Sequence, residues 1–445
     1  METMKVKTTS KEIIKPSSTT PSDLRTLQLS IYDHFLPPIY TVAYLFYAKD
    51  ELMISPEHTS HKLKTSLSET LTKLYPLAGR INGVTVDCND EGAVFVEARV
   101  DNCSLSGFLA SPDLKALQQL LPLDAVVQNP YEAASTWPLL LVKATYFHCG
   151  GMAIGVCITH KIADAASIST FLRTWSAEAR GEAEVVPEFA AASFYPPAND
   201  TYKLPVDEKA SKRSSSITKR FVFGAAKLEE LRTKATTSPE SLHRPTRVES
   251  VTALLWKCFV SATSSETCGG RKVLIQLADL RSRLPSLLPE SLIGNVMFSS
   301  VVLSTTGQGE EVKIEEATRD LRKKKEEFRT MIQDDEDGSS SMMIGSKLAN
   351  LMLTNYSRMS YETHEPYTVS SWCKLPVYEA SFGWGYPVWV VGNVAPAFGN
   401  IAMLIDSKDG RGIEAFVTLP EENMSLLEQN PELLAFASLN PCVLV

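Results

Sequence analysis

The segment 158–175, "ITHKIADAASISTFLRTW", places His160 four residues before Asp164. An alternating apolar run precedes the histidine and a helical spacing of apolar residues follows the aspartate, so the pair stands at a predicted strand-to-helix turn. Side chains at such turns are held rigidly at the edge of a cleft. A helix N-terminus favours the neutral imidazole, which can act as a general base. Such a base would take a proton from a hydroxyl or amine that then attacks a carbonyl group.

The same spacing leaves two roles open for Asp164. If both residues are helical, they share one face and the carboxylate orients the imidazole, as in a catalytic triad. If His160 is still extended, Asp164 points elsewhere and stabilises the fold. The pair alone does not decide, because a chain with seven histidines also produces a His-x-x-x-Asp pattern by chance.

Several enzyme classes are disfavoured because the sequence lacks their motifs. It contains no Gly-x-Ser-x-Gly, no Walker A and no Gly-x-Gly-x-x-Gly pattern. A nucleophile-elbow hydrolase, a P-loop enzyme and a dinucleotide-dependent enzyme are therefore disfavoured. A base without an obvious protein nucleophile favours direct transfer, in which the base activates the acceptor substrate.

Composition narrows the setting. The 445 residues exceed the usual size of one hydrophobic core, which predicts two domains. The net charge of −8 disfavours nucleic acid and anionic membranes as partners. None of the eight cysteines forms a Cys-x-x-Cys pair, so we expect reduced thiols and no metal site. With no apolar run long enough to span a bilayer and no secretory signal, the predicted location is the cytoplasm.

Strands and helices mix without strict alternation, which predicts two mixed α/β halves. A crossover rich in proline, serine and lysine, residues 181–220, separates them. We interpret the acidic run 334–341 as a solvated loop. The predicted strands are 12–18, 220–225, 272–284 and 294–304, two runs within 137–160 joined at 149–151, and a hairpin over 84–100. The predicted helices are 58–76, 244–262 and 312–332. A further helix is predicted after the second of the two runs, with Asp164 in its first turn and an apolar stripe of Ile168, Phe171, Leu172 and Trp175.

A second signal is "SSWCKLPVYEASFGWGYPVWV" at 370–390. Together with "THKIAD" it resembles the plant BAHD acyltransferase family, whose marks are His-x-x-x-Asp and a later Asp-Phe-Gly-Trp-Gly. Further stretches agree in order and spacing: "IKPSSTTP", "YPLAGR", "VDCNDEG", "DLRSR" and "IGN". The resemblance covers essentially the whole chain and is greatest for the group that acetylates alkaloid alcohols.

The resemblance implies an α/β fold of two similar mixed-sheet domains, like chloramphenicol acetyltransferase, around a central solvent channel. The domains would be 1–200 and 201–445. An acyl-CoA, first of all acetyl-CoA, would enter from one side and a small alcohol from the other. His160 would be the general base. Asp164 would pair with Arg281, or alternatively with Arg283, and would thereby position His160. The family implies a monomer with no permanently bound cofactor.

The resemblance also suggests further site residues. Ser370 and Trp372 match a hydroxyl residue and a tryptophan that precede the second motif. Ser370 would donate to the oxyanion or, alternatively, be an ordinary strand-edge serine. Arg247 and Ser250 are weaker candidates for contact with CoA.

The second motif departs from the family pattern at its first position. It reads Ser381, Phe382, Gly383, Trp384, Gly385, with serine where the family has aspartate. An arginine left unpaired and buried by this loss would be strongly destabilising, so either the partner has also changed, or water and Ser381 satisfy it. The main hypothesis is a CoA-dependent O-acyltransferase of plant specialised metabolism, acting on an alkaloid or terpenoid alcohol. A lyase or cyclase, or a non-catalytic binding protein on the same scaffold, is the alternative that Ser381 keeps open.

Overall fold

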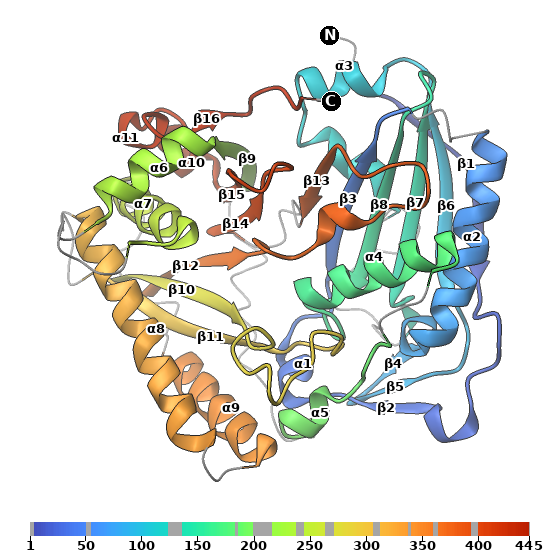
Figure 1. The fold of residues 1–445 in the computed structure, drawn as a ribbon, viewed down its shortest axis with the longest axis horizontal. Coiled ribbons are helices and arrows are strands. Elements are labelled where there is room, and N and C mark those ends of the chain that lie inside the picture. The colour runs from blue at the N-terminus through green and yellow to red at the C-terminus, as the bar shows by residue number, and fades with distance from the viewer. Residues whose placement is uncertain are drawn as a thin grey trace.

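The computed structural model describes residues 4–49, 55–122, 136–182, 186–198, 216–236, 244–262, 271–305, 312–336, 340–358, 364–392 and 399–444. Their strands form two large sheets and one small sheet, with helices packed against the large ones (Figure 1). The predicted α/β class with two sheet-rich halves is confirmed.

The first large sheet holds the strand that leads to His160. Its strand order is β1-β6-β7-β8-β3-β13. The bounds are β1 Val6–Ile14, β3 Tyr40–Tyr47, β6 Ala93–Val100, β7 Leu140–Phe147, β8 Met152–Thr159 and β13 Trp389–Gly392. β7 and β8 are the two strands predicted within 137–160, and they pair antiparallel. All of β8 is buried between β7 and β3, so the residue after its last strand position starts from a rigid base.

Two long helices cover one face of this sheet (Figure 1). They are α2, Pro56–Lys73, and α4, Ala165–Arg180, and both were predicted. The stripe Ile168, Phe171, Leu172 and Trp175 of α4 is buried in the first core. The shorter helices of this half are α1 Ile31–Phe35, α3 Leu105–Ala110 and α5 Ala191–Phe194.

The second large sheet has the order β11-β10-β12-β14-β15-β9-β16. Its strands are β9 Ser216–Phe223, β10 Arg271–Asp279, β11 Met297–Ser304, β12 His364–Ser371, β14 Ile401–Asp406, β15 Ile413–Pro420 and β16 Ser438–Leu439. The helices around it are α6 Ala225–Lys234, α7 Arg247–Ser261, α8 Ile314–Glu336, α9 Ser341–Arg358, α10 Glu421–Leu427 and α11 Pro431–Leu434. The strands and helices expected in this half are present, with shifted ends.

One strand from the second half completes the first sheet. β13 pairs antiparallel with β3, so the chain enters the first sheet before it returns to β14. The indole of Trp389 donates to the Glu414 carboxylate at 3.0 Å, and the buried Arg220 pairs with the same carboxylate at 2.6 Å. Residues of both sheets therefore share one buried polar cluster. The domain boundary at residue 200 stays a prediction.

The hairpin predicted over 84–100 is wrong. β5, Thr85–Asp87, pairs with β2, Thr26–Gln28, and β4, Arg80–Asn82, in the small sheet, whereas β6 pairs with β1 and β7. Between them Gly92 adopts φ +95° and donates its N–H to Ala78 at 2.9 Å, which turns the chain into another sheet. The first four residues of β6 are buried, as expected of a strand paired on both sides.

Other expectations differ less. The strand predicted over 12–18 is β1, which begins at Val6 and ends before Pro16. The predicted crossover contains α5, but its residues 183–185 and 199–215 lie outside the described residues. The solvated loop predicted over 334–341 is wrong at its ends, because 334–336 belong to α8 and 341 begins α9, while 337–339 lie outside the described residues. Among the described helices none is long and apolar enough to cross a bilayer. The described residues also include no cluster of His, Cys, Asp and Glu that could hold a metal.

Candidate active site

His160 directly follows β8 and is only partly buried. Its backbone N–H donates to the carbonyl of Ile39 at 2.7 Å, which continues the pairing with β3 by one residue. Its own carbonyl accepts a hydrogen bond from Asn295 Nδ2 at 2.7 Å. The backbone of the candidate base is thus fixed from two sides, and one of them lies in the distant segment just before β11.

The ring of His160 is oriented by the same asparagine. His160 Nδ1 lies 3.0 Å from Asn295 Oδ1. The amide orientation is determined, because Asn295 Nδ2 donates to the His160 carbonyl and, at 2.8 Å, to Asp33 Oδ1. Asn295 Oδ1 can only accept, so the proton must be on His160 Nδ1. This tautomer leaves a lone pair on Nε2, the atom that a general base needs.

The protonation state agrees with that role. Burial lowers the pKa of His160 below its ordinary value, and this effect outweighs the charge of Asp164 and the hydrogen bond with Asn295, which raise it. The imidazole is therefore neutral at pH 7 and ready to accept a proton.

Asp164 lies deep in a polar network that does not include the His160 ring. It caps the N-terminus of α4, with Oδ1 accepting from the backbone N–H of Ser167 at 2.9 Å and from its hydroxyl at 2.8 Å. Its Oδ2 accepts from Arg281 at 2.8 Å and from the N–H of Val296 at 3.0 Å. Among the residues described, no hydrogen bond joins this carboxylate to His160. The geometry matches the second of the two roles inferred from the sequence.

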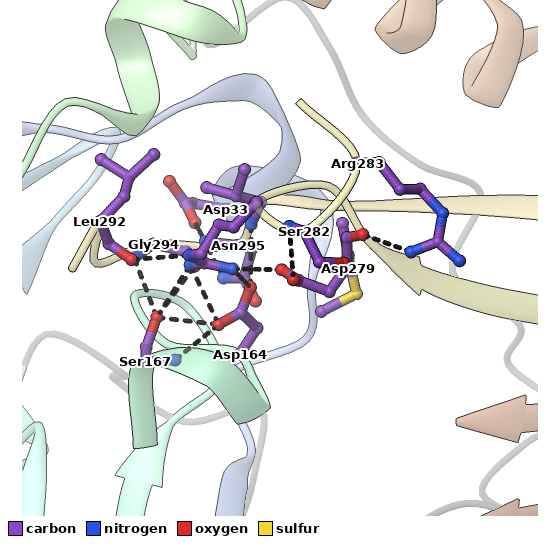
Figure 2. A network of polar contacts seen from close by, with 12 residues as sticks. Asp33, Asp164, Ser167, Asp279, Ser282, Arg283, Leu292, Gly294 and Asn295 are labelled. Atoms are coloured by element: carbon purple, nitrogen blue, oxygen red, sulfur yellow. Dashed lines mark hydrogen bonds and ion pairs between the residues drawn. The ribbon is translucent and has the colours of Figure 1, made fainter. Parts of the chain in front are cut away.

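Arg281 is the partner of that carboxylate. It is 3% exposed, and its nitrogens donate to Asp164, to Asp279 and to the carbonyls of Leu292 and Gly294. Figure 2 shows Arg283 beside Asp279, on the side away from Asp164, where it donates to the Asp279 carbonyl. Burial would raise the pKa of Asp164, but the Arg281 guanidinium and the backbone hydrogen bonds lower it below its usual value.

The two residues that complete the arrangement around His160 were not assigned from the sequence. Asn295 belongs to the "IGN" stretch, which supported the resemblance only. Asp33 is buried on α1 and forms a capping box with Ser30. The Ser-x-x-Asp spacing was a usable signal for a helix start, but nothing local links it to a residue 262 positions later.

Ser370 and Trp372 lie at the end of β12 in the second sheet. Trp372 is buried, and its backbone N–H donates to the Leu404 carbonyl at 2.7 Å. Its ring packs directly against Gly392 of β13. Ser370 pairs with Met403 and is partly exposed. Its role as an oxyanion donor stays a prediction.

Arg247 and Ser250 lie in the first turn of α7. The Arg247 guanidinium pairs with Asp406 at 2.9 Å and donates to the Gly410 carbonyl. Ser250 is fully buried and donates to the Thr246 carbonyl within the helix at 3.1 Å. These contacts hold α7 against the β14–β15 turn, and contact with CoA stays a prediction.

The second motif packs against α4. Phe382 is fully buried edge-on to Trp175, with ring centroids 4.8 Å apart, and stacks on Trp384 at 5.5 Å. Gly383 and Gly385 have φ of +100° and +98°, values that side chains disfavour. The turn therefore keeps the shape that its glycines and aromatic rings require.

The arginine beside Ser381, where the family pattern has aspartate, has a carboxylate partner from another residue. Arg180, the last residue of α4, donates to the Ser381 carbonyl, and its guanidinium forms an ion pair with Glu182 through two nitrogens. The cation beside the turn is Arg180, and its carboxylate comes from Glu182. The Ser381 hydroxyl lies 3.5 Å from the Gly383 N–H.

Comparisons with known proteins agree along the whole chain. The family described as "Transferase family" matches residues 4–434. BAHD acyltransferase BIA1 of Arabidopsis thaliana is 41% identical over 99% of both chains, and akuammiline synthase 1 of Alstonia scholaris is 38% identical over 97% of both. The crystal structure of vinorine synthase superimposes with a TM-score of 0.80 at 33% identity, covering 98% of this chain and 99% of that one. The F. sporotrichioides TRI101 structure, 17% identical with a TM-score of 0.68, shares the fold.

Replacing Asp164 by Asn tests the buried pair. The guanidinium of Arg281 would lose its main counter-charge, so we expect the free energy of unfolding to fall by about 3–5 kcal/mol, measured by chemical denaturation at pH 7. Because the pKa of Asp164 is lowered in the folded protein, its contribution is present above the ordinary carboxyl pKa and is lost as the pH falls through the lowered value. Arg283→Met is the matched control and should change stability by less than about 0.5 kcal/mol. Equal effects of the two variants would contradict the assignment of Arg281 as the partner of Asp164.

Ser381→Asp and Glu182→Gln test the exchange of carboxylates at the second motif. The carboxylate introduced at position 381 would lie close to Arg180, because the backbone carbonyl of residue 381 already accepts a hydrogen bond from that arginine. We expect Glu182→Gln to lower the melting temperature of the natural chain and to have a smaller effect in Ser381→Asp, because Arg180 then has a second partner. Glu230→Gln, at a carboxylate that pairs with Lys227 along α6, is the control. An effect of Glu182→Gln that is independent of residue 381 would rule out the exchange.

Proposed function

The chain belongs to the BAHD acyltransferases of the Transferase family and is a CoA-dependent O-acyltransferase, and we propose that it acetylates a hydroxyl of a polycyclic plant alcohol. Its class is that of acyltransferases moving groups other than aminoacyl groups. Relatives named limonoid 21-O-acetyltransferase, from Melia azedarach, and stemmadenine O-acetyltransferase, from Catharanthus roseus, support a terpenoid or alkaloid acceptor. Acyl-CoA is the co-substrate, and acetyl-CoA is the proposed donor.

In the proposed mechanism His160 is the general base. Its Nε2 removes the proton of the acceptor hydroxyl, and the oxygen attacks the thioester carbonyl. The tetrahedral oxyanion then collapses, the carbon–sulfur bond breaks, and the imidazolium returns its proton to the departing CoA thiolate. The observation that carries this proposal is the Asn295 contact at His160 Nδ1, which leaves Nε2 unprotonated.

The other residues have supporting roles in this mechanism. Asp164 and Arg281 hold the turn that presents His160, without touching its ring. Ser370 is the proposed donor to the oxyanion, with Trp372 fixing the end of β12. The lyase, cyclase and binding-protein hypotheses rested on Ser381, whose carbonyl is held by an arginine with a carboxylate partner. The acyltransferase is therefore the better supported hypothesis.

We further propose a monomeric, cytoplasmic enzyme without a permanently bound cofactor. The free thiols of the seven described cysteines support a reducing compartment. The proposed partners are acyl-CoA and a small alcohol only, with no nucleic acid and no membrane.

The first test is mass spectrometry of products formed from acetyl-CoA and a panel of limonoid and indole-alkaloid alcohols. We expect one product heavier by one acetyl group and no product from His160→Ala, because general-base catalysis contributes roughly 10²–10⁴-fold. His148→Ala, at an exposed histidine of the β7–β8 turn, is the matched control and should retain activity. Undiminished transfer by His160→Ala would overturn the proposed base. Products without added acyl mass would instead favour a lyase.

The pH profile follows from the lowered pKa of His160. The active form is the neutral imidazole, so kcat/KM should be constant around pH 7–8 and should fall about tenfold per pH unit once the pH is below the pKa of that ring. Because burial lowers this pKa, the midpoint should lie below the ordinary histidine value of about 6.5. Initial rates of CoA release between pH 5 and pH 9 measure it. A midpoint above 6.5 would contradict the assignment.

A further inference from the structure

We propose that Asp33 is a positioning residue for His160 and acts through the side-chain amide of Asn295. The inference rests on the proposed role of His160 as the base. It assigns to a residue of α1 the function that the aspartate of a catalytic triad has, with an amide placed between carboxylate and imidazole. Asp164, the aspartate close in sequence, then has a different task.

Asp33 is held as a carboxylate by four donors. Its Oδ2 accepts from the N–H of Ser30 at 3.0 Å and from the Ser30 hydroxyl at 2.7 Å. Its Oδ1 accepts from the N–H of Asn295 at 2.9 Å and from its Nδ2 at 2.8 Å. Every one of these four partners donates, and an ionised carboxylate is the form that only accepts. Burial raises the pKa of Asp33 above its ordinary value, and the donors from Ser30 and Asn295 offset only part of that rise, so the assignment as a carboxylate rests on the four donors.

The orientation of the Asn295 amide, between Asp33 and His160, is fixed by this carboxylate together with the His160 carbonyl. If Asn295 were rotated by 180°, its Oδ1 would face Asp33 Oδ1 and the His160 carbonyl, and its Nδ2 would face the ring. Two contacts between acceptors would then replace two hydrogen bonds. Asp33 therefore favours the arrangement in which Asn295 accepts from His160 Nδ1.

The negative charge also strengthens the hydrogen bond at the ring. A carboxylate at the N–H end of an amide polarises the carbonyl end, so Asn295 Oδ1 becomes a better acceptor. This matters most when His160 carries the substrate proton and both its ring nitrogens are donors. Asp164 is less suited, because Arg281 holds both of its oxygens, at 2.8 and 3.2 Å.

Nitrogen NMR of the protein labelled with ¹⁵N-histidine reports the tautomer without any acceptor substrate. The spectrum of His160→Ala identifies the His160 signals among the seven histidines. In the natural protein near pH 8, we expect Nδ1 to be protonated and Nε2 not. The reverse tautomer would overturn the proposal without the need for a position-33 variant.

Asp33→Asn then tests the carboxylate itself. The new amide has to place its NH₂ against the N–H of Ser30 or against the donors of Asn295, so we expect the second tautomer to appear. Wherever the acceptor panel gives a product, kcat should fall about 10- to 100-fold, less than for loss of the base, with the KM for acetyl-CoA unchanged. Ser30→Ala is the matched control, because it removes part of the capping box and keeps both contacts between Asp33 and Asn295. It should leave the tautomer unchanged.

The outcomes separate this inference from the function on which it rests. If His160→Ala is inactive while Asp33→Asn keeps the natural tautomer and kcat, Asp33 has no positioning role and the base assignment stands. If His160→Ala is active, the base assignment fails and the tautomer is still measurable. Should Asp33→Asn not fold, Asn295→Ser carries the same test, because it keeps the backbone donor to Asp33 and removes the amide. A single Nδ1–H tautomer in that variant would refute the relay.

Discussion

The buried ion pair between Asp164 and Arg281 is the contact on which the candidate site depends. The two side chains are 4% and 2% exposed, so their charges are compatible with the interior only if each is paired and fully hydrogen-bonded. Arg281 meets this condition with donors to two carboxylates and to the carbonyls of Leu292 and Gly294. The segment from Leu292 to Val296 is thereby held against the start of α4. Asn295 belongs to that segment, so the residue that contacts the His160 ring is positioned by a pair that does not touch it.

Helix α4 extends this constraint across the molecule. Its N-terminus is capped by Asp164, and its last residue, Arg180, holds the carbonyl of Ser381. Between these ends Trp175 packs edge-on against Phe382 and donates its indole N–H to the carbonyl of Leu63 on α2 at 3.2 Å. The two sequence motifs lie about 220 residues apart, yet both contact one helix, so α4 connects them physically.

The sequence was most informative where structure is local. The strands β7 and β8, the helices α2 and α4, and the aspartate-to-arginine pair followed from periodicity or from the family resemblance. The hairpin over 84–100 failed because β5 and β6 pair with strands that are distant in sequence, and alternation in one segment says nothing about its partners. The entry of β13 into the first sheet is of the same kind. Asn295 and Asp33 were missed because a tautomer depends on three residues brought together from three separate segments, and no spacing records that.

The two motifs differ in how much change their positions tolerate, and exposure explains the difference. The side chains of Arg180 and Glu182 are 25% and 55% exposed, so water supports the guanidinium and an exposed carboxylate just after α4 serves as its partner. Serine at 381 then costs little, since the backbone carbonyl and the two glycines, not the side chain, define the turn. The interior around Arg281 offers no such substitute: a changed Asp164 would leave a buried cation without its main partner, and a shifted α4 would displace Asn295 from His160. The carboxylate that pairs at the end of α4 is thus open to water, while the one at its start is buried with its partner. The absence of the family's aspartate from the second motif is therefore compatible with an intact arrangement around His160.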